Sequence, residues 1–328
     1  MSQSQSQSLK TYILRRLIQM VVIFFVVIFI VFLLIHLAPG DPLVYLAGDY
    51  ALPPDVKTEL TARYGLDQPI YVQMLVFFEN ILTGNLGESI TFRTPVLQLI
   101  VERMPATLLL MVSGLSFAVF LGLILGVTSA VKFRTKIDFT ISIVSAIGYS
   151  LPTFVLGLIL IMVFAVWFPV FPMLGMSSTG GVYGLGYYSD VLQHLILPSI
   201  AMGTVTLTMI TRLTRMRMLE VMQEDYVTTA RAKGISEMKV IFKHALKNAS
   251  LPVVTIIGME VGYIFAGAVL TETVFSWPGL GQLLATAVFA RDYPLIMGMF
   301  TIITLMMLIS ILVTDLIYTV IDPRIRLG

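Results

Sequence analysis

The chain has no cysteine among its 328 residues. It therefore cannot form a disulfide framework, a thiolate metal site or a cysteine nucleophile. Charged residues are also scarce: they make up 12% of the chain, which is about half of what a soluble domain carries. Hydrophobic residues make up 57%, and several of their uninterrupted runs reach the roughly 20 residues that a helix needs to cross a bilayer. This composition indicates a membrane protein.

Signatures of enzymes are missing as well. The chain contains no G-x-x-x-x-G-K-[ST] segment, so it has no phosphate-binding loop of that type. Neither G-x-S-x-G nor H-E-x-x-H occurs, and the three histidines, His36, His194 and His244, lie on different segments. We therefore predict no catalytic residue, no bound cofactor and no metal site in this chain. The net charge of +2 is too small to indicate nucleic-acid binding.

The apolar runs predict an all-α polytopic membrane protein with six transmembrane helices. The expected spans are about 17–37, 105–131, 137–168, 191–210, 251–275 and 294–321. Residues 1–16 precede the first span, and their Ser/Gln tract at 1–8 is expected to be disordered. The first apolar run has no A-x-A cleavage site, which favours an uncleaved helix over a signal peptide. The third span is long enough to tilt or to kink at Pro152.

Basic residues set the expected orientation, because cytoplasmic flanks carry an excess of Lys and Arg. One side of the predicted spans holds sixteen of the 21 basic residues. They are Lys10, Arg15, Arg16, Lys132, Arg134, Lys136, Arg212, Arg215, Arg217, Arg231, Lys233, Lys239, Lys243, Lys247, Arg324 and Arg326. Both termini are therefore expected in the cytoplasm, and the chain in the cytoplasmic (inner) membrane of a prokaryote as a multi-pass protein.

Two regions follow the first span. The segment 38–104 has eight acidic and four basic residues and amphipathic stretches such as 72–82, which predict a small helical extracytoplasmic domain. The segment 105–328 is expected to form the core, with the other five spans and one long polar cytoplasmic segment at 219–250.

The cytoplasmic segment 219–250 is the main candidate for function. Glu224 and Asp225 are expected to begin a short helix, Gly234 to let the backbone leave it, and Ser236 to cap a second helix. The segment is polar and basic, and it lies between two apolar spans. We expect it to form a structured element on the cytoplasmic surface.

Two faces are expected on the second helix. Met238, Ile241, Phe242 and Ala245 have the spacing of one apolar face. The lysines at 239, 243 and 247 recur every four residues and form a basic stripe. The physical chemistry leaves two interpretations open: lysines that meet anionic lipid, or a docking surface for another protein.

Two acidic residues fall inside predicted spans, Glu260 near the middle of the fifth and Asp315 near the end of the sixth. A carboxylate in the membrane is costly and usually faces a cavity or a partner. Either residue is therefore a candidate for the transport pathway or for helix packing.

The segment 226–252 resembles the cytoplasmic loop of permease subunits of binding-protein-dependent ABC importers. In that family the loop is E-A-A-x-x-x-G followed by I-x-L-P; here 228–234 is T-T-A-R-A-K-G, and Leu251-Pro252 closes it. The Thr replacements and the longer distance to Leu-Pro resemble the dipeptide/oligopeptide branch. Further pieces of that branch recur in order along nearly the whole chain. They include P-G-D-P at 39–42, Y-G-L-D-Q-P at 64–69, G-N-L-G-E-S at 84–89, F-S-W-P-G-L-G at 275–281 and D-P-R-I-R at 322–326.

The resemblance implies a type I ABC importer permease fold and a complex of five parts. A second homologous permease would complete the pathway, two ATP-binding subunits would use ATP and Mg, and an extracytoplasmic substrate-binding protein would deliver the cargo. The long first outside loop resembles the first-type permease of the pair. The residues implied to dock on the ATPase are Tyr226, Thr229, Ala230, Arg231, Ala232, Gly234 and Ile235.

The substrate stays open at this point. Di- and oligopeptides are expected, while the same branch resembles permeases for nickel, glutathione and oligosaccharides. The alternative from another class is a stand-alone secondary transporter that uses Glu260 and Asp315 as ion sites. Such carriers often contain internal repeats, and none is apparent in this sequence.

Overall fold

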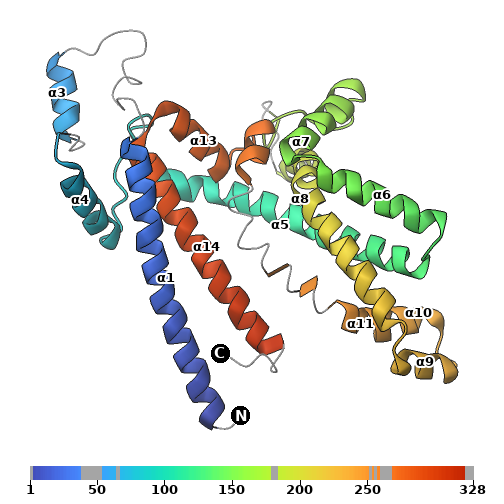
Figure 1. Cartoon of the computed structure of the whole chain (residues 1–328). Coiled ribbons are helices and arrows are strands. Elements are labelled where there is room, and N and C mark those ends of the chain that lie inside the picture. Colours follow the sequence, from blue (N-terminus) through green and yellow to red (C-terminus); the bar gives the residue numbers. More distant parts are fainter. Residues whose placement is uncertain are drawn as a thin grey trace. The chain divides into compact units, whose positions relative to one another are not determined.

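The computed structural model describes residues 3–37, 54–63, 67–178, 184–250, 253–254, 257–258 and 268–321. The described residues are largely helical, with an isolated β-bridge between Glu88 and Pro95 (Figure 1). The chain divides into two compact units. The first consists of Met1–Pro105 with Gly279–Gly328, and the second of Ala106–Pro278.

The first unit is built around the first and last long helices. It contains α1 (Gln3–Leu37), α3 (Pro54–Arg63), α4 (Ile70–Leu82), the beginning of α5 (Val96–Val131), α13 (Leu280–Ala290) and α14 (Tyr293–Ile321). Helix α1 packs along α14 and contacts α4. Ile28 and Phe32 of α1 are buried with Met297 of α14, and aromatic side chains of α4 cover this cluster.

The second unit contains the rest of α5 and the helices that follow it. These are α6 (Lys136–Ser150), α7 (Thr153–Ile161) with the π-helical turn η1 (Met162–Trp167), α8 (Leu185–Val221), α9 (Asp225–Ala232), α10 (Glu237–Lys239), the π-helical turn η2 (Val240–Ala245) and α11 (Leu246–Ala249). Residues 268–274 are also helical. Helix α8 is central, because α6, α7 and α11 all pack on it.

Helices α5 and α8 approach closely along a seam of small residues. Gly114, Ala118, Gly122 and Gly126 recur every four residues on α5, so they share one face of that helix. A Cβ atom at Gly126 would lie 2.6 Å from Cβ of Thr214 and 2.8 Å from the carbonyl oxygen of Thr211. Small residues at this spacing let helix backbones approach in membranes. The seam therefore fixes α5 against α8.

Four described helices are long and apolar enough to cross a membrane: Leu14–Ile35, Val96–Val131, Leu185–Val221 and Tyr293–Asp315. The pair Lys136–Ser150 and Thr153–Trp167 counts as a fifth span if it is taken as one segment, although it is bent by 106°. Leu151 is extended because it precedes Pro152. A bend at the predicted position, Pro152, is therefore confirmed, but it is a break between two helices and not the tilt or kink of one span that was predicted.

Several predicted boundaries are wrong. The Ser/Gln tract expected to be disordered is helical from Gln3, as part of α1. The second span begins at Val96 and contains Pro105 in its interior, although proline is best tolerated in the first turn. Helix α8 extends beyond the predicted 191–210 in both directions. The expected fifth span, 251–275, lies mostly outside the described residues.

Candidate functional site

The chain turns where α8 ends and the 219–250 segment continues. Glu224 is extended, and α9 begins at Asp225, so the predicted start of this helix is confirmed. Asp225 stands in the first turn, where the helix dipole favours an acidic residue. Val227 and Ala230 of α9 are buried against Val240 of η2. Helix α9 therefore packs back on the segment that follows it.

Gly234 ends α9 in a Schellman motif. Its φ of +73° is left-handed, its N–H donates to the carbonyl of Arg231 at 2.9 Å, and the N–H of Ile235 donates to the carbonyl of Ala230 at 3.3 Å. Ile235 also packs on the cluster that contains Ala230, which supplies the apolar contact typical of this motif. The predicted role of Gly234 as the exit from the helix is confirmed.

The second helix buries only part of the predicted apolar face. Val240, Ile241, Ala245 and Ala249 are buried. Met238 is 65% exposed and Phe242 is 52% exposed, so half of the predicted apolar face points away from the chain. The π-helical turn at Val240–Ala245 changes the register that an α-helical spacing assumes. Ser236 is at the cap position, but its side chain makes no capping hydrogen bond.

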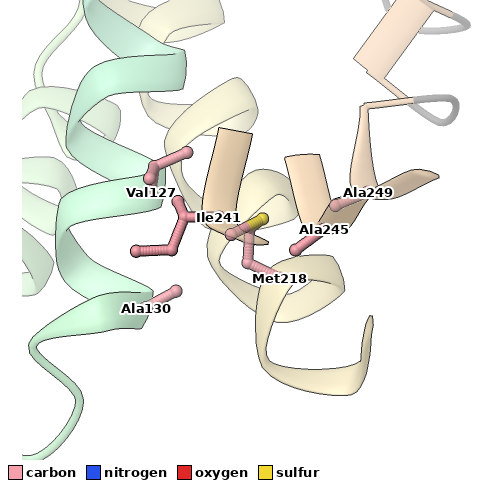
Figure 2. Close-up of a cluster of buried hydrophobic side chains, with 6 residues drawn as sticks. All are labelled: Val127, Ala130, Met218, Ile241, Ala245 and Ala249. Carbon is pink, nitrogen blue, oxygen red and sulfur yellow. The ribbon is translucent and has the colours of Figure 1, made fainter. Parts of the chain in front are cut away.

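This buried face attaches the 219–250 segment to two long helices. Ile241, Ala245 and Ala249 pack against Val127 and Ala130 at the end of α5 and against Met218 near the end of α8 (Figure 2). The side chains of this cluster are apolar, and each is at least nine-tenths buried. A displacement of the 219–250 segment is therefore expected to move the ends of α5 and α8 with it.

Arg231 and Glu237 form an ion pair across the Gly234 turn. Nη2 of Arg231 lies 2.8 Å from Oε1 of Glu237, and Nε lies 3.2 Å from Oε2. The hydrogen bonds from Arg231 lower the pKa of Glu237, and those to Glu237 raise the pKa of Arg231. A lowered carboxyl pKa means that the stabilisation is present above the ordinary Glu pKa and is lost as the pH falls through the lowered value.

Tyr226 joins α9 to α11. Its hydroxyl oxygen accepts a hydrogen bond from Nδ2 of Asn248 at 2.8 Å, yet 40% of the residue is exposed. Helix α9 is therefore attached to the following helices by the apolar cluster around Val227, by the Schellman motif and by this hydrogen bond.

The structure separates the seven predicted docking residues into two groups. Ala230 is buried and Ile235 is partly buried, so both pack inside the segment. The other five are exposed. They are Tyr226, Thr229, Arg231, Ala232 and Gly234. Sequence spacing alone could not separate the groups, because α9 is short and its partner, the π-helical turn, was not expected.

An ion-pair network near the same helix ends was missed. Asp138 of α6 accepts hydrogen bonds from Nε and Nη2 of Arg215 of α8, at 2.7 and 2.9 Å. Its carboxylate also accepts from the hydroxyl of Ser129 at 2.5 Å and from the N–H of Arg134 at 3.0 Å. The isolated acidic residue just after the basic 132–136 flank was the sequence signal for this network.

The structure describes one of the two acidic residues that were predicted inside spans. Glu260 lies outside the described residues. Asp315 forms an ion pair with Arg16, whose Nη2 lies 2.6 Å from Oδ2, and this pair joins α14 to α1. The pairing accords with the packing interpretation of Asp315.

Two buried carboxylates were not identified from the sequence. Glu272 is fully buried, and its Oε1 accepts a hydrogen bond from the hydroxyl of Thr107 at 2.7 Å. Asp292 is also fully buried and caps α14 through the N–H of Leu295. It accepts a further hydrogen bond from the hydroxyl of Ser89 at 2.5 Å. Neither residue lies in the apolar middle of a predicted span, so neither was considered for a role in the membrane.

Comparison with known proteins agrees with this arrangement. Residues 118–327 match the family "binding-protein-dependent transport system inner membrane component", and residues 9–111 match the N-terminal component of such systems. The chain belongs to this family. It is thus a membrane permease component and not the ATP-hydrolysing subunit, as the sequence predicted.

Relatives match over almost their full length. The di/tripeptide transport system permease protein DppB of Pseudomonas aeruginosa is 44% identical, over 96% of this chain and 98% of that protein. The dipeptide transport system permease protein DppB of Escherichia coli is 41% identical over the same shares. The oligopeptide transport system permease protein AppB of Bacillus subtilis is 40% identical over 96% and 99%.

Proposed function

We propose that this chain is one of two permease subunits of an ATP-driven importer for di- and oligopeptides. The observation that carries the proposal is the 44% identity over 96% of the chain to a protein named as a di/tripeptide permease. Dipeptide and oligopeptide permeases from other bacteria support the same cargo class at 40–41% identity. The other cargo classes of the resemblance, nickel, glutathione and oligosaccharides, have no such support among these relatives.

The 219–250 segment is proposed to receive the movement of the ATP-binding subunits. Met238 and Phe242 are large apolar side chains exposed on an otherwise polar segment, and an exposed apolar patch with a polar rim is typical of a protein docking site. Exposed Tyr226, Arg231 and Ala232 lie on the same compact element. These exposed side chains favour a protein partner over the lipid interpretation of the lysine stripe.

The proposed topology follows the distribution of basic residues. Six spans, including one at 251–275, leave both termini in the cytoplasm and place 38–104 outside the membrane. Helices α3 and α4 within 38–104 support a small folded extracytoplasmic domain. A substrate-binding protein is proposed to approach from that side, and a second permease to complete the pathway.

Reconstitution in liposomes tests this proposal. The chain is inserted alone and, separately, with its second permease, two ATP-binding subunits and the binding protein. We expect ATP-driven uptake of a labelled dipeptide only with the complete set, and competition by other peptides but not by nickel, glutathione or an oligosaccharide.

The same experiment can overturn the proposal. If nickel, glutathione or an oligosaccharide competes and peptides do not, the proposed substrate is wrong, although the assignment as an ATP-driven importer still holds. Peptide flux driven by a proton or sodium gradient through the chain alone would instead favour a secondary transporter. The matched variant for that outcome is Glu260→Gln, which should then abolish the flux.

A further inference from the structure

A cavity of about 270 Å³ lies between the end of α5, helix α6 and the final turns of α8. Its lining includes the guanidinium-bearing residues Arg212 and Arg215 of α8. None of its lining residues belongs to the 219–250 segment that carries the predicted docking residues.

The cavity carries an excess of positive charge. Arg215 is paired with Asp138. The guanidinium of Arg212 lies over the ring of Tyr149, 5.4 Å from its centroid. No carboxylate within the described part of the chain pairs with it. The stacking holds the guanidinium in place, and its N–H groups can bind an anion.

Two hydroxyl groups of α6 add hydrogen-bonding capacity. Ser142 and Ser145 lie one turn apart and both line the cavity. Ser145 is 4% exposed, and neither hydroxyl has a hydrogen-bond partner among the described residues. A serine hydroxyl can donate one hydrogen bond, so an anion here would meet hydroxyl donors from α6 and guanidinium donors from α8.

The same cavity has an apolar side. Ile141 of α6 and Met216 of α8 line it. The cavity also lies at the ends of candidate membrane spans, since α5 ends at Val131 and α6 begins at Lys136. A ligand with an anionic head and apolar chains fits both sides.

We propose that this cavity binds the phosphate headgroup of an anionic phospholipid, with Arg212, Ser142 and Ser145 as donors and the apolar lining of the cavity against the acyl chains. Basic pockets between transmembrane helices are known to take anionic headgroups. Because Arg215 of the same cavity is paired with Asp138, the bound lipid would stabilise the contact between α6 and α8. The inference goes beyond the proposed transport function and does not depend on the cargo.

Native mass spectrometry of the complete, delipidated importer tests the site. The complex is titrated with phosphatidylglycerol or phosphatidylcholine, using the unaltered chain, Arg212→Gln and the matched control Arg217→Gln. Arg217 is on the same helix but pairs with Glu220 and does not line the cavity. We expect one preferred phosphatidylglycerol, bound about tenfold more weakly by Arg212→Gln and unchanged by Arg217→Gln. A second variant, Ser142→Leu, places a bulky side chain at an exposed edge of the cavity and should weaken binding in the same way.

Three outcomes would overturn the proposal. In the first, the variants at Arg212 and Ser142 bind phosphatidylglycerol as tightly as the unaltered chain does, or Arg217→Gln loses as much affinity for it as Arg212→Gln. In the second, inorganic phosphate binds as well as the lipid and displaces it, which would assign the site to a free anion. In the third, a dipeptide displaces the lipid, which would assign the cavity to cargo. Transport is not measured, so a failure here is distinguishable from a failure of the proposed function.

Discussion

Arg215 holds Asp138 with two hydrogen bonds, from Nε to Oδ1 at 2.7 Å and from Nη2 to Oδ2 at 2.9 Å. The pair joins the first turn of α6 to α8, close to the cluster where Ile241 packs on Met218. Planar, two-point pairing of this kind requires arginine, because lysine presents a single ammonium.

The Asp138–Arg215 pair is predicted to be important for stability. Asp138 is 5% exposed, and removing one partner of a buried pair leaves the other charge uncompensated. We expect Asp138→Asn or Arg215→Gln to lower the unfolding free energy by about 3 kcal/mol. The exposed pair of Arg217 and Glu220 is the control, and Glu220→Gln should cost about 0–1 kcal/mol.

Thermal unfolding of the purified complex measures both changes. The double variant Asp138→Asn/Arg215→Gln should be less destabilised than the sum of the single variants, since the two residues share one interaction. Additive losses would mean that the two side chains act independently.

The small-residue seam between α5 and α8 is predicted to exclude a methyl group at Gly126. A Cβ there would meet Thr214 at 2.6 Å and the backbone oxygen of Thr211 at 2.8 Å. At Gly114, on the same face, the nearest atom would be 3.5 Å away. We expect Gly126→Ala to cost about 1–3 kcal/mol through overpacking and Gly114→Ala to be tolerated. Equal melting temperatures for the two variants would contradict the seam.

Glycine is predicted to be required at position 234 because of its backbone conformation, and not because a side chain there would clash with its surroundings. Apart from its two neighbours in the chain, no described residue has an atom within 4 Å of a Cβ built at this position. Its φ is +73°, however, and this conformation costs an L-residue about 1–2 kcal/mol. Asparagine tolerates this region better than β-branched residues. Gly234→Val should therefore reach the membrane but lose peptide uptake, while Gly234→Asn keeps most of it. Uptake is compared between cells that contain equal amounts of each variant in the membrane. Normal uptake by Gly234→Val would show that the left-handed conformation at Gly234 is not needed for transport.

The absence of native cysteine makes the proposed topology directly testable. Single cysteines at Gln68 and Ser178, both exposed, should react with an impermeant thiol reagent added to sealed cells. A cysteine at Ser236, exposed in the 219–250 segment, should react only after the cells are opened. Ser89 belongs to the segment 38–104, which is proposed to lie outside, but it is a poor site because it is fully buried against Asp292. Labelling at Ser236 in sealed cells would reverse the orientation.

Sequence patterns predicted the features that depend on local chemistry. The long apolar runs predicted the helical class. Asp225 and Gly234 predicted the two ends of α9, and Pro152 marked the position of the bend between α6 and α7. Each depends on a backbone preference that one residue imposes on its neighbours.

Features that depend on contacts between distant segments were not predicted. The choice between Met238 and Val240 as a buried residue depends on a π-helical turn and on the surface that α5 and α8 offer. The partners of Asp138 and Asp292 come from other elements. The repeat of small residues at 114, 118, 122 and 126 was visible in the sequence and was overlooked, so the α5–α8 seam could have been predicted.

The hydrogen bond between Ser89 and Asp292 joins residues 203 positions apart, and this separation has a consequence for biosynthesis. A ribosome that adds about 5–20 residues per second completes Ser89 roughly 10–40 seconds before Asp292 exists. During that interval the turn at 85–95 has no carboxylate for the Ser89 hydroxyl and the Thr91 N–H, and α1 has no α14 to pack on. The contiguous Ala106–Pro278 unit can assemble meanwhile, whereas the unit made from both ends of the chain must wait for the last helix.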